Sequence, residues 1–142
     1  MEVWRLETDE GIGIYQSVIG FDGRRQPSLW SRSTNNSCDP DWHPIPHSSQ
    51  HLMSQFDDKA HLRNFIEYSF GFSGKRQFLQ WVFDPKWRHA LVKNGVLLNI
   101  YNVDKRLCLV DNHQVMFIKD KAKLIKTMAV NAFDLEKRNE VR

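Results

Sequence analysis

The chain has few cysteines and no long apolar run. Only two of its 142 residues are cysteines, Cys38 and Cys108, and they lie far apart in the sequence. Two distant thiols do not form the framework of a disulfide-rich secreted domain, so we expect free thiols and a cytoplasmic protein. The longest apolar stretches fall far short of the ~20 residues that a membrane-spanning helix needs. We therefore expect no membrane association.

We also expect neither a secretory leader nor a phosphate-binding loop. The first residues, MEVWRLETDE, are acidic and lack the basic and apolar regions of a signal peptide. In GFSGK (71–75) only two residues separate Gly71 from Gly74, whereas a P-loop has four there, and Arg76 follows where Ser or Thr would hold Mg²⁺. This spacing excludes P-loop nucleotide hydrolysis. We expect instead that Ser73 caps a helix and that Gly71 permits close packing.

The length of the chain predicts a single domain, and its charge differs between an acidic N-terminal half and a basic C-terminal half. A chain of 142 residues is the typical size of one domain, and we expect residues 1–142 to form it. Residues 1–71 hold 6 Lys/Arg against 10 Asp/Glu, and residues 72–142 hold 14 against 7. A basic C-terminal half fits an anionic partner, such as a nucleotide, nucleic acid or acidic protein, and it also fits a basic solvated surface.

Alternating and apolar runs predict a mostly antiparallel sheet. In residues 2–7 Val3, Arg5 and Glu7 should share one face of a strand. The apolar run VLLNIYNV predicts a central buried strand. The predicted strands are 2–7, 65–72, 96–103, 107–110 and 114–118.

Capping residues predict two or three helices. Asp84 and Pro85 begin one helix and Asn94-Gly95 ends it, and shorter helices are expected over 57–65 and 74–83. Residues 122–133 fit a helix or a strand. Residues 20–51 are rich in Gly, Pro, Ser, Asn and Asp and predict a long irregular loop. The fold class is therefore α+β, with a sheet that is possibly split.

The long loop carries a cluster of metal-ligand residue types. His43, His47 and His51 are spaced by four, and Cys38 and Asp41 precede them. Prolines between the first two histidines exclude a regular helix there, and no second Cys or His cluster accompanies them. We predict no metal site.

Exposed aromatic and basic residues are the candidates for contact with a partner. Trp30 and Trp42 lie in the long loop, where they could anchor a protein partner together with Arg24 and Arg25. Basic residues interleaved with aromatics also serve nucleic-acid binding. Further basic residues for that function are Lys119, Lys121, Lys123 and Lys126.

Arg5 is unusual because it lies within the first predicted strand, between Trp4 and Leu6. A charge in such a place is costly unless it is paired or binds an anion. The alternative is that its face looks toward solvent and that Glu7 or Glu2 offsets its charge.

The order of several segments resembles a known layout. An Arg-bearing strand (VWRLE) precedes a glycine-rich bend with Tyr15 (GIGIY), an aromatic strand (FGF) leads into QFLQW, and VLLNIYNV and NHQVMFIKDKA follow. This order resembles small ADP-ribosyltransferase-like domains. It is also similar to a group of small uncharacterised phage proteins with an FGF…Q-L-x-x-W stretch.

The first resemblance implies NAD bound in a cleft of a split antiparallel sheet. Arg5 would hold a phosphate of the cofactor, while Tyr15, Phe72 and Ser73 would contribute to the cofactor site. Gln114 would occupy the position of the family's catalytic Glu, which is thought to stabilise the ribose cation. Gln carries no charge for that task, so the resemblance implies NAD or nucleotide binding with catalysis by Gln114 and Arg5 in doubt.

The second resemblance implies a different activity. A phage-type protein of this size can act without catalysis, by binding and inhibiting a host protein in the host cytoplasm. Nucleic-acid binding is the third hypothesis. The fold alone does not decide among them, because one fold supports many functions.

Overall fold

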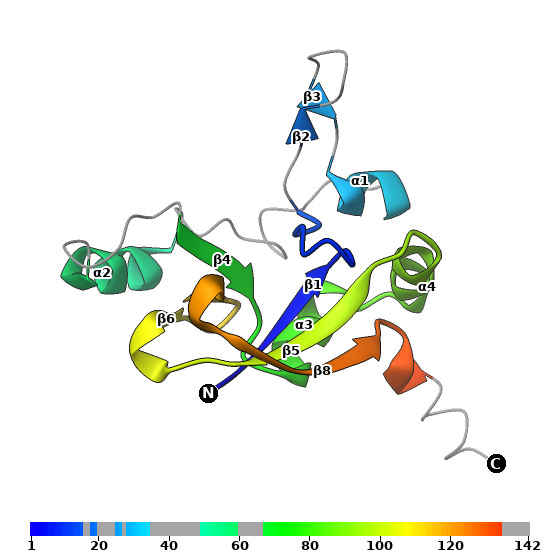
Figure 1. Cartoon of the computed structure of the whole chain (residues 1–142). Helices are drawn as coiled ribbons and strands as arrows, with labels where there is room; N and C mark the ends of the chain where they lie inside the picture. Colours follow the sequence, from blue (N-terminus) through cyan, green and yellow to red (C-terminus); the bar gives the residue numbers. More distant parts are fainter. Residues whose placement is uncertain (16–17, 20–24, 27, 35–48, 60–66, 135–142) are drawn as a thin grey trace.

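The computed structural model describes residues 1–15, 18–19, 25–26, 28–34, 49–59 and 67–134. It contains two three-stranded antiparallel sheets (Figure 1). The first has the order β1 (Glu2–Glu7), β5 (Leu97–Asn102), β8 (Lys123–Ala129), and the second has the order β4 (Tyr68–Gly71), β7 (Val115–Ile118), β6 (Cys108–Val110). Two short strands, β2 (Val18–Ile19) and β3 (Arg25–Gln26), pair with each other.

One isolated bridge joins the two sheets. The Trp4 N–H donates to the Phe72 carbonyl at 2.8 Å, and the Phe72 N–H donates to the Trp4 carbonyl at 2.6 Å. A Cβ on Gly71 would lie 2.7 Å from the Trp4 carbonyl oxygen and from Val3 Cγ1, so only glycine fits this crossing without displacement. The predicted packing role of Gly71 is confirmed, as is the α+β class with a split antiparallel sheet.

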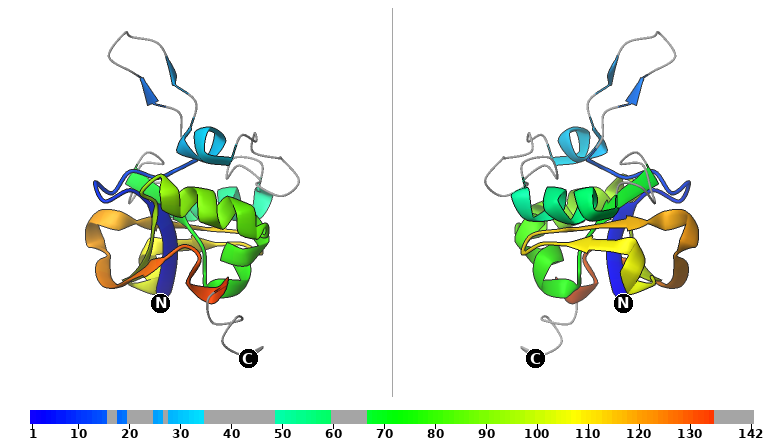
Figure 2. Two further views of the ribbon diagram at one scale, coloured as in Figure 1. Left: turned by 90° about the vertical axis from the view of Figure 1, so that its right-hand side faces the viewer. Right: turned by 90° about the vertical axis from the view of Figure 1, so that its left-hand side faces the viewer.

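Helices cover the outer faces of both sheets (Figure 2). They are α1 (Leu29–Thr34), α2 (Gln50–Lys59), α3 (Lys75–Trp81) and α4 (Pro85–Lys93), with 3-10 turns η3 (Lys105–Leu107) and η4 (Lys119–Lys121). Helices α1, α3 and α4 pack their apolar residues against Leu6 and Leu98 of the first sheet. Leu52 of α2 packs against Leu109 and Met116 of the second.

The inner faces of the two sheets share a core of their own. Val3 and Tyr101 from the first sheet contact Val115 and Phe117 from the second. Burying these side chains between the sheets stabilises the fold by removing apolar surface from water. One face of β1 therefore lies between the sheets, and that face carries Arg5 and Glu7 as well as Val3, because residues i, i+2 and i+4 of a strand share a face.

The caps predicted for α4 are confirmed. The Asp84 carboxylate accepts a hydrogen bond from the Lys86 N–H at 2.9 Å, and Pro85 is the first helical residue. Asn94 is the C-cap, and Gly95 follows with φ of +78°, a conformation that glycine adopts without strain.

The prediction that Ser73 caps α3 is wrong. Gly74 occupies the N-cap position, without a side-chain hydrogen bond, and Ser73 is exposed. Its own N–H donates instead to Gln77 Oε1 at 2.8 Å, so a glutamine inside the helix satisfies a backbone group that precedes it. The helix expected over 74–83 is present as α3, over Lys75–Trp81, with Phe78 and Trp81 buried.

The helix predicted over 57–65 lies earlier in the sequence. Helix α2 ends at Lys59, and its first turn is capped by Ser49, whose hydroxyl accepts from the Leu52 N–H at 3.1 Å. Asp57 therefore lies in the last turn, where a carboxylate is unfavourable for the helix dipole. Residues 60–66 lie outside the described residues.

The segment 20–51, predicted as a long irregular loop, includes β3, α1 and the start of α2. The expectation that Trp30 is exposed is wrong, because its side chain is wholly buried. Its ring lies 5.5 Å from Tyr15 and 5.3 Å from Trp87, centroid to centroid, so it is a core residue. Residues 35–48 lie outside the described residues.

The alternative of helix or strand near the C-terminus is resolved as the strand β8. It pairs with β5 along its length, with a bulge between Ile100 and Tyr101. After β8, Phe133 stacks on Trp4, with ring centroids 5.8 Å apart. Asp134 accepts two hydrogen bonds from Arg88, at 3.0 and 2.7 Å. These contacts hold the chain after β8 against α4 and β1.

Candidate functional site

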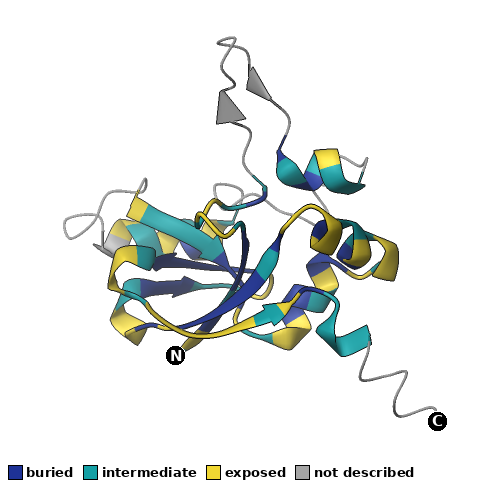
Figure 3. Cartoon of the chain, turned by 45° about the vertical axis from the view of Figure 1, so that its right-hand side comes forward, coloured by how far each residue is buried: buried dark blue, intermediate teal, exposed yellow. Residues whose placement is uncertain are grey.

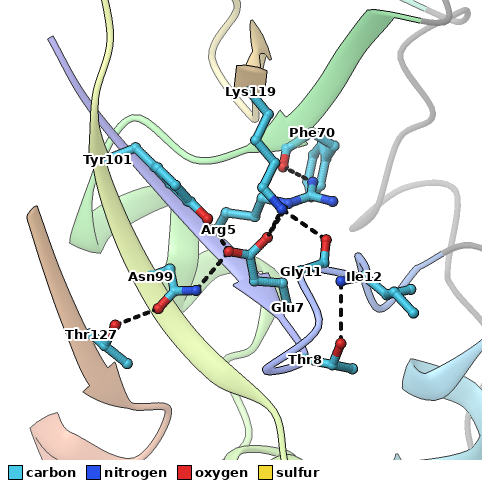
Figure 4. Close-up of polar contacts among 10 residues, drawn as sticks. All are labelled: Arg5, Glu7, Thr8, Gly11, Ile12, Phe70, Asn99, Tyr101, Lys119 and Thr127. Carbon is cyan, nitrogen blue, oxygen red and sulfur yellow. Dashed lines mark hydrogen bonds and ion pairs between the residues drawn. The ribbon is translucent and has the colours of Figure 1, made fainter. Parts of the chain in front are cut away.

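A buried carboxylate, Glu7, is the centre of the largest polar cluster among the described residues (Figure 4). Its Oε2 accepts hydrogen bonds from Arg5 Nε at 2.9 Å and from Lys119 Nζ at 2.8 Å. Its Oε1 accepts from Asn99 Nδ2 at 2.6 Å and from the Tyr101 hydroxyl. The residue is 1% exposed; its bonds from Arg5, Asn99 and Tyr101 are buried, and the bond from Lys119 is partly buried.

Strand register brings these side chains together. Arg5 and Glu7 alternate along β1, and Arg5 lies opposite Asn99 on β5, so their side chains share one face of the sheet. Thr127 on β8 extends the cluster by donating to Asn99 Oδ1 at 2.7 Å. Lys119 enters from η4, after the last strand residue of β7, and also donates to the Gly11 carbonyl at 2.8 Å.

Arg5 connects the cluster to the second sheet. Its Nη1 donates to the Phe70 carbonyl on β4 at 2.6 Å, while its Nε binds Glu7. A Cβ on Gly13 would lie 2.7 Å from Arg5 Nη2, so the glycine leaves room for the guanidinium. The expected pairing of Arg5 with Glu7 is confirmed, whereas the expectation that this face looks toward solvent is wrong, because Arg5 is buried.

The partners decide the ionisation of Glu7 and Tyr101. Burial opposes the charged carboxylate, but hydrogen bonds from Lys119, Tyr101, Asn99 and Arg5 outweigh it and hold the pKa of Glu7 below its usual value. Burial, together with the hydrogen bond to Glu7, raises the pKa of Tyr101. At neutral pH the cluster therefore holds an ionised Glu7 and a neutral Tyr101 that donates to it.

The arrangement suits a structural role better than a reactive one. A carboxylate has about four acceptor positions, and each oxygen of Glu7 already accepts two hydrogen bonds. A substrate or metal ion would have to displace one of these buried donors. The cluster links β1, β5 and β8 of the first sheet to β4 of the second sheet and to η4, which follows β7. It therefore fixes the relative position of the two sheets.

The residues assigned to NAD by resemblance lie in different surroundings. Phe72 and Gln114 are fully buried, Tyr15 packs among aromatic rings, and Ser73 is exposed. Arg5 belongs to the Glu7 cluster.

A separate polar chain brings Ser73 and Gln114 toward each other. Gln77 Oε1 accepts from the Ser73 N–H at 2.8 Å, and Gln77 Nε2 donates to the Asp111 carbonyl at 3.0 Å. The Asp111 carboxylate in turn accepts from the Gln114 N–H at 2.8 Å. These bonds fasten the start of α3 to the turn between β6 and β7, which is a structural task.

The described surface includes two open depressions near loops and helix ends. One of about 440 Å³ is lined by Thr8, Asp9, Glu10, Ile12, Asn94, Gly95 and Leu97. The other, of about 360 Å³, is lined by Ser49, Gln50, His51, Asp111, Asn112 and His113. Neither is lined by Arg5, Tyr15, Phe72, Ser73 or Gln114.

The remaining candidates are placed as follows. Four of the five metal-ligand candidates lie outside the described residues, namely Cys38, Asp41, His43 and His47. The fifth, His51, is exposed. The described residues contain no cluster of three or more His, Cys, Asp or Glu side chains suited to a metal ion. Arg24 and Trp42 also lie outside the described residues, and Arg25 is in β3. Within the part of the chain that is described, no helix is both long and apolar enough to span a bilayer.

The most exposed strand of the first sheet is β8 (Figure 3). Five consecutive residues from its start, Lys123 to Thr127, are exposed, and Leu124 and Ile125 each keep 50% of their surface in water. Lys121 precedes it and is exposed too. We call Lys121, Lys123, Leu124, Ile125 and Lys126 the β8 edge. Lys119, which sequence reasoning grouped with these lysines, instead binds Glu7.

Sequence reasoning found Arg5 but missed its surroundings. Glu7 was named as a possible partner, while Asn99, Tyr101 and Thr127 were not considered. The apolar strand LLNIYN contains one signal, because an Asn and a Tyr two residues apart share a face of the strand. Buried polar side chains need partners, so this face was a place to look for the partners of Arg5.

Comparison with known proteins places the chain in a family. The family model described as "Bacteriophage T4 Y00F protein" matches residues 1–131. No curated protein and no solved structure gave a significant match. The match agrees with the expected similarity to small phage proteins, and the comparisons give no support to the ADP-ribosyltransferase resemblance.

Proposed function

The chain belongs to the Bacteriophage T4 Y00F protein family, and on that premise we propose that it is a non-catalytic phage protein that binds and inhibits a host protein. The observation that carries the proposal is the β8 edge, a basic strand with two half-exposed apolar side chains. Large apolar side chains in water next to a strand edge are typical of a surface that a partner covers.

The polar cluster supports the same proposal from inside the molecule. Its carboxylate already accepts from four donors, and its basic groups bind Glu7 and backbone carbonyls. Groups held in this way stabilise a fold, whereas a general acid or base must be able to reach a reacting atom. A binding function needs only a stable scaffold with an accessible surface.

The proposal is tested with the tagged full-length chain and the bacterial host. Affinity purification after crosslinking should recover a host protein in fixed stoichiometry, and the two purified proteins should form the same complex on mixing. The activity of that host protein should fall as the chain is added. Failure of the purified proteins to form a complex, or a complex with full activity, contradicts the proposal.

NAD or nucleotide binding stays a prediction from the resemblance. Arg5 would then have to exchange its bond to Glu7 or to the Phe70 carbonyl for one to a phosphate. Binding calorimetry with NAD and incubation with labelled NAD and host lysate test it directly, and the absence of both binding and transfer removes the hypothesis. Nucleic-acid binding, the third hypothesis, predicts a gel shift that weakens as salt rises.

A further inference from the structure

We infer that the β8 edge binds an acidic, extended segment of a partner protein, which adds to the first sheet as a fourth strand. This inference rests on the proposed function and names the surface and the chemistry of the partner. Addition of a strand to an exposed sheet edge is a general mode of peptide recognition, in which backbone hydrogen bonds give affinity and side chains give specificity.

The backbone of β8 is available for such pairing. In the first sheet it is a terminal strand, and within the described residues it pairs only with β5. Its seven residues make a strand of ordinary length. An edge strand presents a row of backbone N–H and C=O groups on the side away from its neighbour. A partner segment in extended conformation can therefore pair along it.

The side chains determine which segment fits. Lys123 and Lys126 are exposed within the strand and Lys121 just before it, and Lys123–Ala129 contains no Asp or Glu. Leu124 and Ile125 lie between the lysines. Opposite charges facing each other across paired strands stabilise the pairing, and apolar pairs do the same. The complementary segment thus has both carboxylates and apolar residues.

The same charges argue against a second copy of this chain as the occupant. Pairing the β8 edges of two copies would bring six lysine side chains together, namely Lys121, Lys123 and Lys126 from each copy. Like charges across paired strands are destabilising, and lysines on an edge protect natural sheets against self-association. Acidic residues in the partner reverse the sign of this interaction and make the edge selective.

The lysines can be changed with little effect on the fold. Lys123 and Lys126 are exposed and form no ion pair among the described residues, in contrast to the partly buried Lys119. Exposed substitutions of this kind usually change stability by about 0.5 kcal/mol or less. The double variant Lys123→Glu/Lys126→Glu therefore tests binding. Lys86→Glu/Lys105→Glu is the matched control, since both residues are exposed and lie on other elements.

The probe is a nine-residue peptide of alternating Glu and Val with blocked ends, titrated into the ¹⁵N-labelled full chain. We expect amide shifts and slower amide exchange concentrated in residues 121–129. The Lys123→Glu/Lys126→Glu variant should bind at least tenfold more weakly, and the control variant should bind as the parent chain does. A peptide with Lys in place of Glu should bind the charge-reversed variant and not the parent.

The inference is overturned by amide shifts centred outside 121–129, by an equal loss of binding in the control variant, or by binding at this edge of single-stranded DNA of equal charge but not of the peptide. A β8-mediated dimer of the free chain also contradicts it. A host complex that forms equally well with the charge-reversed variant leaves the proposed function standing and rejects the inference. Peptide binding at residues 121–129 without any host complex supports the inference about the edge and rejects the proposed function.

Discussion

Glu7 shows how much of this fold depends on one side chain. It is 1% exposed and accepts hydrogen bonds from groups on β1, β5 and η4. Removing one member of a buried ion pair leaves the others buried without compensation, and such changes cost about 3–5 kcal/mol. Three of its four donors also reach β4, β8 or the Gly11 bend, so the loss affects both sheets.

Glu7→Gln should therefore lower the free energy of unfolding by about 3 kcal/mol or more, because Gln keeps the shape but leaves Arg5 and Lys119 without a counter-charge. Urea unfolding followed by circular dichroism measures it. The control is Glu2→Gln on the same strand, which is exposed and should change stability by about 0.5 kcal/mol or less. Equal effects of the two variants would contradict a structural role for the cluster.

Gly71 supplies a second prediction at this scale. Gly71→Ala places a methyl group 2.7 Å from the Trp4 carbonyl oxygen, at the bridge that joins the sheets. Since a backbone atom cannot move aside cheaply, we expect a loss of about 2–3 kcal/mol, at the upper end of overpacking costs. The matched variant is Gly74→Ala, where a Cβ meets nothing within 4 Å. It should cost no more than about 1 kcal/mol for the poorer N-cap. Thermal unfolding distinguishes them.

At the scale of elements, α3 and α4 start in different ways. The Asp84 side chain caps α4, whereas α3 begins at Gly74 without a side-chain cap. Asp84→Ala should cost about 1 kcal/mol, the usual value for a lost N-cap. Ser73→Ala should change stability by about 0.5 kcal/mol or less, because its side chain caps nothing. A larger loss for Ser73→Ala than for Asp84→Ala, measured by chemical denaturation, would reverse this assignment.

Elements whose signals are local could be predicted from the sequence. The caps of α4, the alternation of β1 and the apolar run of β5 depend on neighbouring residues alone, and the structure confirms them. Trp30 could not be placed in this way. Turn-forming residues surround it in the sequence, but Tyr15 and Trp87 bury it, and both come from other segments. The strand β8 was ambiguous for the same reason, since its pairing with β5 decides it.

At the scale of the whole molecule, the polar cluster needs residues from β1, β4, β5, η4 and β8, which come from remote parts of the sequence. Arg5 predicted that a partner exists, and Glu7 two residues on was a local candidate. Lys119 reaches Glu7 across 112 residues, and the basic run that contains it predicted a solvated or anion-binding surface. The packing of the two sheets decides which lysine side chain is turned inward. The sequence pattern alone therefore could not distinguish Lys119, which binds Glu7, from the exposed lysines of the β8 edge.

The cluster also predicts how stability of the whole molecule depends on pH. Because the pKa of Glu7 is lowered in the folded state, its contribution is present above its ordinary pKa of 4.5 and is lost as pH falls through the lowered value. Because the pKa of Tyr101 is raised, its contribution is present below about pH 10 and is lost as pH rises through the raised value. Unfolding free energy should therefore fall at both ends of the pH range.

Urea unfolding between pH 3 and pH 11 checks this profile with two variants. Glu7→Gln should flatten the acidic fall. Tyr101→Phe should flatten the alkaline fall and only reduce the acidic one, because Lys119, Asn99 and Arg5 still lower the pKa of Glu7. The exposed pair of Asp104 and Arg106, which lowers the pKa of Asp104 to about 2, also adds to the acidic fall. Salt screens that exposed pair far more than the buried one. If the free energy of unfolding falls at acidic pH and high salt in the parent chain but not in Glu7→Gln, the buried cluster causes that fall. A fall of equal size in the two proteins would show that other carboxylates cause acid unfolding.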